Sequence, residues 1–548
     1  LKDEKITQEA RNLAHLVLIT TEVDELPTII SGWIAENIKP VKKVKKGPSK
    51  KNRPPKNYGQ EYTGRNRRAT TYKKAQDLYS KNKRLLADKI LKGKSLFEEE
   101  MYPQVEAVEK VYGGILESAS PKDGEQFVTR ERRKNTYYPI TMKDVAFVKN
   151  NWPNSAPGPD GLDTADVKKV PNEVLAILFS VMLLQKFVPP SWREARTTLL
   201  HKEGPRDDPK NWRPITIGSA IQRLFHRIIA NRLKAAFSLN TLQRGFVDVD
   251  GTLANAVLLE YYMNARRKGR KTYNVVSLDI SKAFDTVSHF SLIRALWRLD
   301  IEDSMIKYIQ TTFQSSTVMN VPRMGRTHKL SFNRGVRQGD PLSPLLFVAV
   351  MDELLTELND GSVGGSIGDQ EKVACLVFAD DLILLADKDV DMPVILDTVS
   401  CFVAKRGMEI NPTKSRALSV GIVKGAPVVR TKSIFSVNRK KIPTMDYLDS
   451  FRYLGQAYNA TGVLKPSLTN LQVWLDNVDR SPLKPHQKVD LINTFVIPKL
   501  LYGLQNYRVN SRILRDADRM IKSSVRFILH LHTRTARWRS RDHRTSIR

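Results

Sequence analysis

The stretch Phe378-Ala379-Asp380-Asp381 interrupts an apolar run that extends from residue 373 to residue 386. The apolar residues on each side are typical of a short buried strand, so the acidic pair is predicted to lie at the turn of a β-hairpin. Adjacent carboxylates repel each other unless a cation compensates them, and Mg²⁺ prefers oxygen ligands of this kind. Aspartate is also a common turn residue, so the pair by itself leaves metal binding and an ordinary turn equally open.

A third carboxylate lies far upstream in the sequence. The run 275–280 is typical of a strand, carries Asp279 near its end and is followed by residues 281–285. If this strand lies beside the hairpin, Asp279 joins Asp380 and Asp381 at one point. Three acids can hold two divalent cations roughly 3.5–4 Å apart, an arrangement that suits in-line phosphoryl transfer. The sequence therefore predicts a two-metal site formed by these acids.

These two segments resemble catalytic motifs of the reverse transcriptases, and specifically of the non-LTR retrotransposon family. Residues 378–381 are similar to the family's aromatic-X-Asp-Asp box, and residues 279–285 resemble its first catalytic motif. Further matches follow in the family's order: two fingers motifs at 155–161 and 211–215, a nucleotide-pocket motif at 335–344, a fourth palm motif at 407–411 with Lys414, and a primer grip at 453–455. Within the family, the chain most resembles the site-specific elements that insert into ribosomal RNA genes.

The resemblance implies roles for the residues of the catalytic centre. Asp279 and Asp380 would ligate two Mg²⁺ ions, Asp381 would ligate more weakly, and the backbone carbonyl of Ile280 would supply another oxygen.

Two neighbouring residues have different expected roles. The ring of Phe284 would lie under the sugar of the incoming nucleotide and exclude a 2′-hydroxyl. Asp285 resembles a family residue that is not a ligand, and we expect a turn residue or a helix cap. Residues 341–344 are predicted to begin a helix that continues through Met351 and Leu355.

The remaining motif residues would bind substrate. Arg213 suits phosphate oxygens because its guanidinium is planar, and Lys202 would assist it. Gln338 and Gly339 would form part of the nucleotide pocket, although Gln338 also fits an ordinary polar loop. Lys414 would protonate the pyrophosphate leaving group, or it is an exposed lysine without a role. The primer 3′ end would be positioned by Tyr453, Leu454 and Gly455, for which simple turn packing is the competing interpretation.

Composition agrees with a nucleic-acid-binding protein. The 548 residues include 89 basic and 58 acidic side chains, a net charge of +31, and such an excess favours a polyanionic partner. Only Cys375 and Cys401 are present, so a buried thiol and a reducing compartment are expected rather than a disulfide. No apolar run is long enough for a transmembrane helix, and no signal peptide is visible. Because the chain starts at Leu1 rather than Met, we expect a fragment.

The chain is predicted to contain several domains. They are N-terminal helices with a basic linker (1–60), a basic helical extension that binds RNA (61–135), fingers (136–270), a palm with a fingers insertion (271–460), a helical thumb (461–532) and a disordered arginine-rich tail (533–548). Within the extension, residues 65–91 are predicted to form one amphipathic helix. Its apolar face, which carries Leu78, Leu85, Leu86 and Ile90, is expected to pack against the fingers and leave its basic face for template RNA.

The predicted fold is therefore α+β, a right-hand polymerase of fingers, palm and thumb with a basic helical N-terminal extension. The implied reaction copies an RNA template into DNA from a 3′-hydroxyl primer with dNTPs and two Mg²⁺ ions. Template RNA and primer or target DNA are the expected partners, no membrane is involved, and the work is nuclear. Two alternatives stay open: a group II intron maturase or telomerase-like reverse transcriptase, and a non-catalytic RNA-binding protein derived from such an element.

Overall fold

The structure is a computed structural model that describes residues 2–19, 26–39, 64–97, 101–120, 135–202, 204–359, 362–368, 371–432, 434–464, 468–505 and 511–531. The predicted linker beyond residue 39 and the arginine-rich tail lie outside the described residues. The chain divides into two units, one of residues 1–44 and 101–462 and the other of residues 45–100 and 463–548. Residues 64–97 and 101–120, which were predicted as parts of one extension, therefore fall in different units.

A five-stranded sheet in the order β11-β10-β3-β9-β8 carries the acidic motifs of the first unit. Its strands are β3 (Tyr273–Asp279), β8 (Cys375–Phe378), β9 (Asp381–Ala386), β10 (Arg416–Val423) and β11 (Ala426–Val429). Strand β9 is buried along nearly its whole length and pairs antiparallel with both β3 and β8. A strand covered on both faces has to be apolar at successive positions, which explains the continuous apolar run around the acidic pair.

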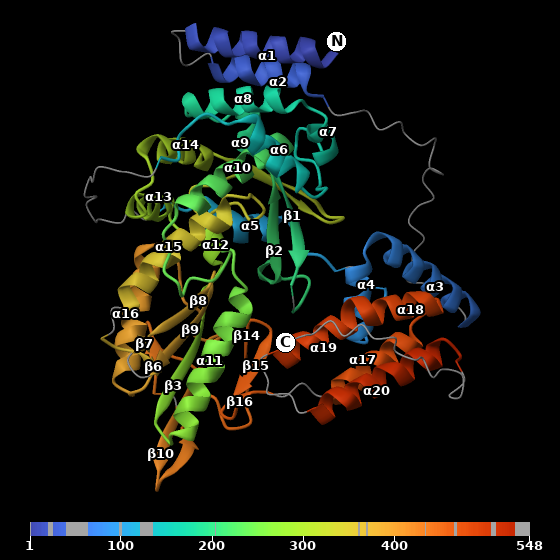
Figure 1. The fold of residues 1–548 in the computed structure, drawn as a ribbon, viewed down its shortest axis with the longest axis vertical. Helices are drawn as coiled ribbons and strands as arrows, with labels where there is room; N and C mark the ends of the chain where they lie inside the picture. Colours follow the sequence, from blue (N-terminus) through green and yellow to red (C-terminus); the bar gives the residue numbers. More distant parts are fainter. Residues whose placement is uncertain are drawn as a thin grey trace, which may run out of the picture. The chain divides into compact units, whose positions relative to one another are not determined.

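Helices cover this five-stranded sheet, which is called the catalytic sheet below because it carries the acidic motifs. Helices α15 (Ser343–Leu358) and α16 (Asp391–Lys405) contact β8 and β9, and the alternate residues Leu382, Leu384 and Ala386 belong to the large core that they share. Helix α11 (Gly251–Lys268) crosses in front of the sheet in Figure 1, and Nδ2 of its Asn255 donates to the carbonyl of Val377 in β8. The predicted helix after residues 341–344 is confirmed as α15.

A second sheet has the order β2-β1-β4-β5. Strands β1 (Glu194–His201) and β2 (Trp212–Ile217) form its first hairpin, and β4 (Ser316–Val321) pairs parallel to β1 and antiparallel to β5 (Gly325–Ser331). The segment between Asp285 and Gly335 thus contributes strands to a sheet begun near residue 194. Helix α5 (Val105–Leu116) packs on this sheet, where Val108, Tyr112 and Leu116 share an apolar cluster with Trp212 and Leu330.

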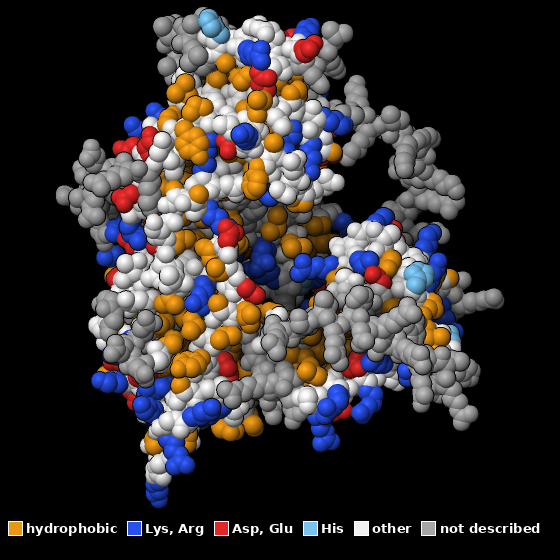
Figure 2. Space-filling view, viewed as in Figure 1, with side chains coloured by type: hydrophobic (Ala, Val, Ile, Leu, Met, Phe, Trp, Pro, Cys, Tyr) orange, Lys and Arg blue, Asp and Glu red, His pale blue; other side chains and the backbone are white. Residues whose placement is uncertain are grey.

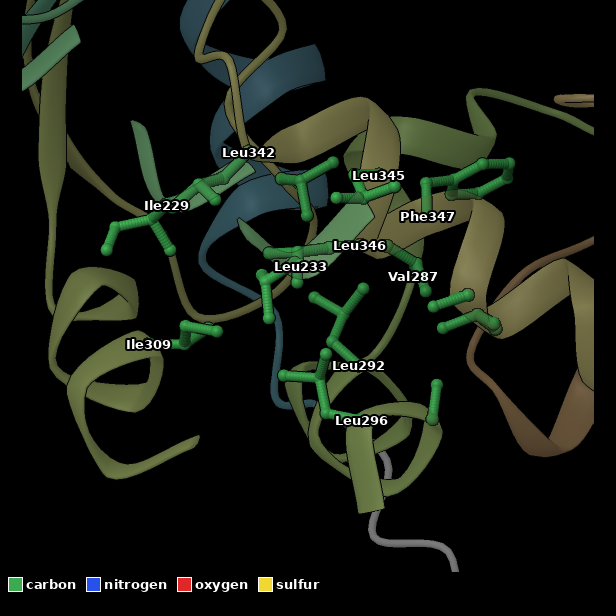
Figure 3. Close-up of a cluster of buried hydrophobic side chains, with 14 of the residues drawn as sticks. Ile229, Leu233, Val287, Leu292, Leu296, Ile309, Leu342, Leu345, Leu346 and Phe347 are labelled. Carbon is green, nitrogen blue, oxygen red and sulfur yellow. The ribbon is translucent and has the colours of Figure 1, made fainter. Parts of the chain in front are cut away.

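The two sheets are joined by a helical core. Figure 3 shows part of this core, to which α10, α13, α14 and α15 each contribute buried side chains. Those labelled include Ile229, Leu233, Leu292, Leu296, Ile309, Leu345, Leu346 and Phe347. The helices of this unit outside α5, α11, α15 and α16 are α1 (Lys2–Ile19), α2 (Leu26–Asn37), α6 (Met142–Asn150), α7 (Thr164–Lys168), α8 (Asn172–Leu184), α9 (Pro190–Arg193), α10 (Ala220–Ala236), α12 (Ala283–Thr286), α13 (His289–Arg298) and α14 (Asp303–Phe313). Its short strands are β6 (Gly365–Ile367), β7 (Glu371–Val373), β12 (Ser436–Val437), β13 (Lys440–Lys441), β14 (Phe451–Tyr453) and β15 (Gln456–Asn459).

The second unit is helical. The region predicted to be a helical thumb contains α17 (Leu468–Arg480), α18 (Pro485–Leu491), α19 (Ile497–Gln505) and α20 (Ser511–Ile528). A π-helical turn, Ile492–Val496, connects α18 and α19 just before Pro498, which has no N–H to donate to the preceding turn.

The basic amphipathic helix of the extension differs from the prediction in two ways. It is broken into α3 (Gly64–Lys81) and α4 (Lys83–Leu91) at Asn82, whose side chain accepts the N–H of Leu85 and caps α4. The break shifts the helical phase, so Leu85 is exposed while Leu86 is buried. The apolar face packs against α17 and its neighbours in the second unit, and Tyr79 donates to Asp490 of α18. The prediction that this apolar face packs against the fingers is therefore wrong.

Candidate active site

The three acidic residues of the prediction meet at one end of the catalytic sheet. In the antiparallel β3–β9 ladder, Asp279 lies directly opposite Asp381, and Phe378 of β8 lies opposite Asp381 on the other side. Residues directly opposite each other across such a ladder have Cβ atoms roughly 4.5–5.5 Å apart. Ala379 and Asp380 form the turn between β8 and β9, and Ala379 adopts a left-handed φ of 57° to make it. The predicted convergence of distant carboxylates is therefore present in the fold.

Burial acts on all three carboxyl groups, and repulsion by neighbouring acids acts on Asp279 and Asp381. Burial, together with the charges of Asp380 and Asp279, raises the pKa of Asp381 to about 6. Burial also raises the pKa of Asp279, which Asp380 raises too and Lys414 lowers. Burial raises the pKa of Asp380, against the opposing charges of Lys202 and Arg213. A cluster of this kind is stabilised by bound cations.

The donor set fits magnesium. Carboxylate oxygens are its preferred protein ligands, and Ile280, whose backbone carbonyl is the predicted additional ligand, forms an isolated bridge with Ile410 and lines the same cavity. Over the described residues, no three His, Cys, Asp or Glu side chains are already gathered in an arrangement that would hold a metal ion. The carboxylates of Asp279, Asp380 and Asp381 are the groups that would hold the ion.

A cavity of about 860 Å³ gathers the predicted catalytic, metal-binding and substrate-binding residues. Its wall includes Asp279, Ile280, Asp380, Asp381, Lys202, Arg213, Phe284, Gln338, Gly339 and Lys414. The predicted primer-grip residues lie elsewhere, on the β14–β15 turn, where Leu454 and Gly455 have positive φ angles. Tyr453 is buried and its hydroxyl accepts from Asn255, which also bonds to Val377, so this turn is connected to the catalytic hairpin.

The nucleotide-pocket loop is fixed against β2. The carbonyl of Gln338 accepts the N–H of Thr216 at 2.7 Å, which joins the loop to the strand that carries Arg213. Gly339 has a φ of +123°, and a Cβ atom there would lie 2.5 Å from the carbonyl oxygen of Thr216. Glycine is therefore required for this close approach.

The structure corrects the expectation for Asp285. Helix α12 begins after Lys282, so Asp285 is not its cap. Instead, Oδ1 of Asp285 is buried and accepts Nε2 of Gln338 at 2.7 Å. Burial raises the pKa of Asp285 to about 6, although Gln338, Lys282, Lys202 and Arg213 oppose the shift. The residue fixes the orientation of the Gln338 amide, a function that its position in the sequence alone does not indicate.

A buried polar network holds the same loop from behind, and the sequence analysis missed it. The guanidinium of Arg337 donates to the carbonyls of Trp192 and Arg193 and to Ser315. The carboxylate of Asp340 is paired with Nδ1 of His226 at 2.7 Å. A charged residue that enters a core needs partners of this kind, and these partners come from segments distant in sequence.

The predicted sugar-excluding ring is held by other aromatic rings. Phe284 stacks on the buried Phe347 with a centroid distance of 4.5 Å and an interplanar angle of 19°. Phe246 meets Phe284 edge-on at 6.4 Å, lines the cavity, is 48% exposed and has a left-handed φ of 58°. An exposed aromatic ring on such a backbone marks Phe246 as a site residue that the sequence analysis did not identify.

Basic side chains form the other part of the cavity wall. Besides Lys202, Arg213 and Lys414, the wall contains Lys210 and Lys282. Burial lowers the pKa of Lys202, and the neighbouring Arg213 lowers it further. Burial lowers the pKa of Lys282 to about 8. On the face of the molecule in Figure 2, Lys and Arg side chains are widely distributed, in agreement with the net charge of +31.

Residues 200–458 match the family profile described as "Reverse transcriptase (RNA-dependent DNA polymerase)". This part of the chain is a reverse transcriptase domain, which agrees with a fold and an acidic cavity suited to nucleotidyl transfer. The resemblance to non-LTR retrotransposon enzymes is likewise confirmed, because curated relatives are Pol polyproteins of retrotransposable element R2. None of the described helices is long and apolar enough to cross a membrane.

The relatives include proteins from several insects. The chain is 47% identical over 403 residues to the type-1 R2 Pol polyprotein of Popillia japonica, which covers 73% of this chain and 56% of the relative. It is 30% identical over 477 residues to the type-2 R2DM polyprotein of Drosophila melanogaster, which covers 85% and 44%. The chain thus spans about half the length of the curated relatives it matches. Apo telomerase from Candida tropicalis overlaps 62% of each chain at 10% identity and a TM-score of 0.36, a likeness too distant to inform function.

Proposed function

We propose that this chain is an RNA-directed DNA polymerase that extends a 3′-hydroxyl primer along an RNA template with dNTPs. The observation that carries the proposal is the pairing of Asp279 with Asp381 across β3 and β9, with Asp380 at the adjoining turn. These carboxylates share a cavity with five basic side chains, as a site for metal ions and a triphosphate requires. Two Mg²⁺ ions bound there would activate the primer hydroxyl and stabilise charge on the departing pyrophosphate.

The chain's own residues would orient the nucleotide. Arg213 at the start of β2 and Lys202, which directly follows β1, would hold the triphosphate oxygens. Gln338, fixed by Asp285, would contact the nucleotide or the template base, and Phe284 on its aromatic support would exclude a ribose 2′-hydroxyl.

The remaining residues of the proposal act on the leaving group and the primer. Lys414 lines the same cavity as Asp279, and its charge acts on that carboxylate, so its ammonium would protonate the pyrophosphate. Tyr453, Leu454 and Gly455 would position the primer end.

The proposed layout is that of a right hand. Residues 136–270 with the β4–β5 insertion would be the fingers, residues 271–460 the palm, and residues 461–532 the thumb. Helices α3 and α4 would extend the thumb unit, and their exposed Arg68, Lys73, Lys74 and Arg84 are available to template RNA.

The biological role that we propose follows from the R2 relatives. The chain would copy element RNA from the 3′-hydroxyl of a nicked chromosomal target, and it would therefore work in the nucleus. A tagged chain that is excluded from nuclei, or that extends an RNA primer but not a nicked DNA end, would contradict this role.

The test is primer extension on poly(A) RNA with oligo(dT), dTTP and Mg²⁺. Wild type should make DNA, Asp380→Asn should lose at least ~10³-fold in rate, and the exposed Asp397→Asn on α16 should resemble wild type. A wild-type chain that binds poly(A) but makes no product with any divalent cation would favour the RNA-binding alternative. An intron maturase or telomerase-like enzyme would share the acids and the reaction, so the domains that flank this region in the full reading frame distinguish those alternatives.

A further inference from the structure

Lys282 lines the cavity, and its ammonium group has no hydrogen-bond acceptor among the residues that the structure describes. It precedes α12 with a left-handed φ of 47°, which an L-residue adopts only at a cost of roughly 1 kcal/mol, and this backbone bend directs the chain from β3 into α12. Its Nζ is sealed from solvent and, over the described residues, makes no hydrogen bond. A buried ammonium without a hydrogen-bond acceptor is unfavourable, so this position favours the binding of an anion.

The ammonium rests on an aromatic ring. Nζ of Lys282 lies 4.1 Å from the ring centroid of Tyr112, a residue of α5. The hydroxyl of Tyr112 donates to the carbonyl of Trp212 at 2.7 Å and lies 3.3 Å from that of Pro209. These bonds fix the ring next to the segment that carries Lys210 and Arg213. A cation–π contact is weaker than a charge-assisted hydrogen bond and leaves the ammonium free to move to an anion.

The surrounding charges indicate what that anion is. Lys202 and Lys210 repel the ammonium of Lys282, and Asp208 and Asp285 attract it. Both acids already have partners, because Asp285 accepts from Gln338 and Asp208 accepts the N–H of Lys210. Lys202 acts on both Asp380 and Lys282, and all three residues line the same cavity. A group of cations in one cavity with metal-binding acids suits the phosphates of a metal-bound polyphosphate.

We propose that Lys282 leaves the Tyr112 ring to bind the phosphates of the incoming nucleotide, and then those of the pyrophosphate product, and that α5 is thereby part of the nucleotide site. Neither the motif resemblance nor the comparisons assign a role to Lys282 or Tyr112. The inference rests on the proposed polymerase function and adds a phosphate-binding residue to it. Val111 and Ile115 of α5 line the same cavity, which agrees with a place for this helix in the site.

The test compares Lys282→Met, Lys282→Arg and the control Lys307→Met, an exposed lysine of α14 outside the cavity. In steady-state primer extension, Lys282→Met should raise the KM for dTTP by about 10- to 100-fold, the effect of losing one charge-assisted contact. The inhibition constant of pyrophosphate should rise in parallel, and the KM for primer–template should stay within about twofold. Lys282→Arg should recover most of the loss, and Lys307→Met should equal wild type.

Two results would overturn the inference. One is an unchanged dTTP KM and pyrophosphate inhibition in Lys282→Met. The other is an equal rise in the primer–template KM, because the lysine would then act only by holding the fold. If wild type extends no primer, the proposed function fails separately, and calorimetric titration of dTTP with Mg²⁺ decides the role of Lys282. Weaker binding by Lys282→Met than by wild type and Lys307→Met supports the role, whereas equal or absent binding refutes it.

Discussion

Replacing Asp285 with asparagine should change how the stability of the protein depends on pH. The carboxyl group is buried, accepts a hydrogen bond from Gln338 and has a pKa raised by burial from 3.8 to about 6. The folded protein therefore retains a proton that the unfolded chain releases between these pH values. This group contributes stability below its unfolded pKa, and that contribution is lost as the pH rises through its folded pKa.

The size of the effect follows from the shift. About two pKa units at 1.36 kcal/mol each correspond to about 3 kcal/mol of unfolding free energy that wild type loses between pH 4 and pH 7. Asp285→Asn has no such titration, so its stability relative to wild type should improve by about 3 kcal/mol over this range. Its new amide N–H groups lack a partner and cost roughly 1–3 kcal/mol at every pH, which shifts the curve but not its slope.

The assay is urea unfolding at pH 4.5, 5.5, 6.5 and 7.5, followed by tryptophan fluorescence. Trp192 and Trp212 are buried in the first unit and report on it. The exposed Asp397→Asn serves as the control and should keep the wild-type slope. A difference between Asp285→Asn and wild type that is flat across this range would refute the assignment of a buried, titrating carboxyl group at residue 285.

Three further predictions concern the aromatic support and the thiols. Phe284→Val should raise ribonucleotide incorporation at least ~10-fold in primer extension, and an unchanged preference for dNTPs would exclude Phe284 as the sugar-excluding residue. Phe246→Ala should weaken this preference by about 2- to 10-fold, which corresponds to the free energy of one aromatic pair. An effect equal to that of Phe284→Val would contradict a supporting role for Phe246. Both cysteines are free, and burial raises the pKa of the Cys375 thiol, so a thiol reagent should label Cys401 in the native protein and Cys375 only after denaturation. Rapid native labelling of both would contradict the buried position of Cys375.

The sequence predicts well those features that depend on local pattern. The apolar run around Asp380 predicts the hairpin because a strand buried on both faces has few other solutions. The helical character of residues 468–505 and 511–528 and the helix that begins near residue 343 are also found, since their periodicity and proline positions are encoded locally.

Partners across the fold were harder to predict. Asp285 was expected to be a turn residue or a helix cap, but its hydrogen bond to Gln338 joins residues more than fifty positions apart, and no periodicity carries that information. The helix of residues 65–91 was expected to be continuous, but Asn82 is a good N-cap and interrupts it. Its apolar face gives no indication of which other apolar face covers it, so its actual partner, α17, could not be identified.

Phe246 and Lys282 were missed for a related reason. Each has a backbone in the left-handed region, which is not evident for a non-glycine residue in sequence. Their places in the cavity wall become apparent only when β3, α5 and the segment before α11 are brought together in space.

Metal binding tests the whole account most directly, because it requires β3 and β9 to present their acids to the same ion. Binding of Mn²⁺ in place of Mg²⁺, with dTTP present, can be followed by electron paramagnetic resonance without any turnover. Asp279→Asn and Asp380→Asn should each weaken binding at least ~10-fold, whereas Asp397→Asn should not. Wild-type affinity in the Asp279→Asn variant would show that this residue shares no ion with the hairpin, and the proposed active site would be wrong.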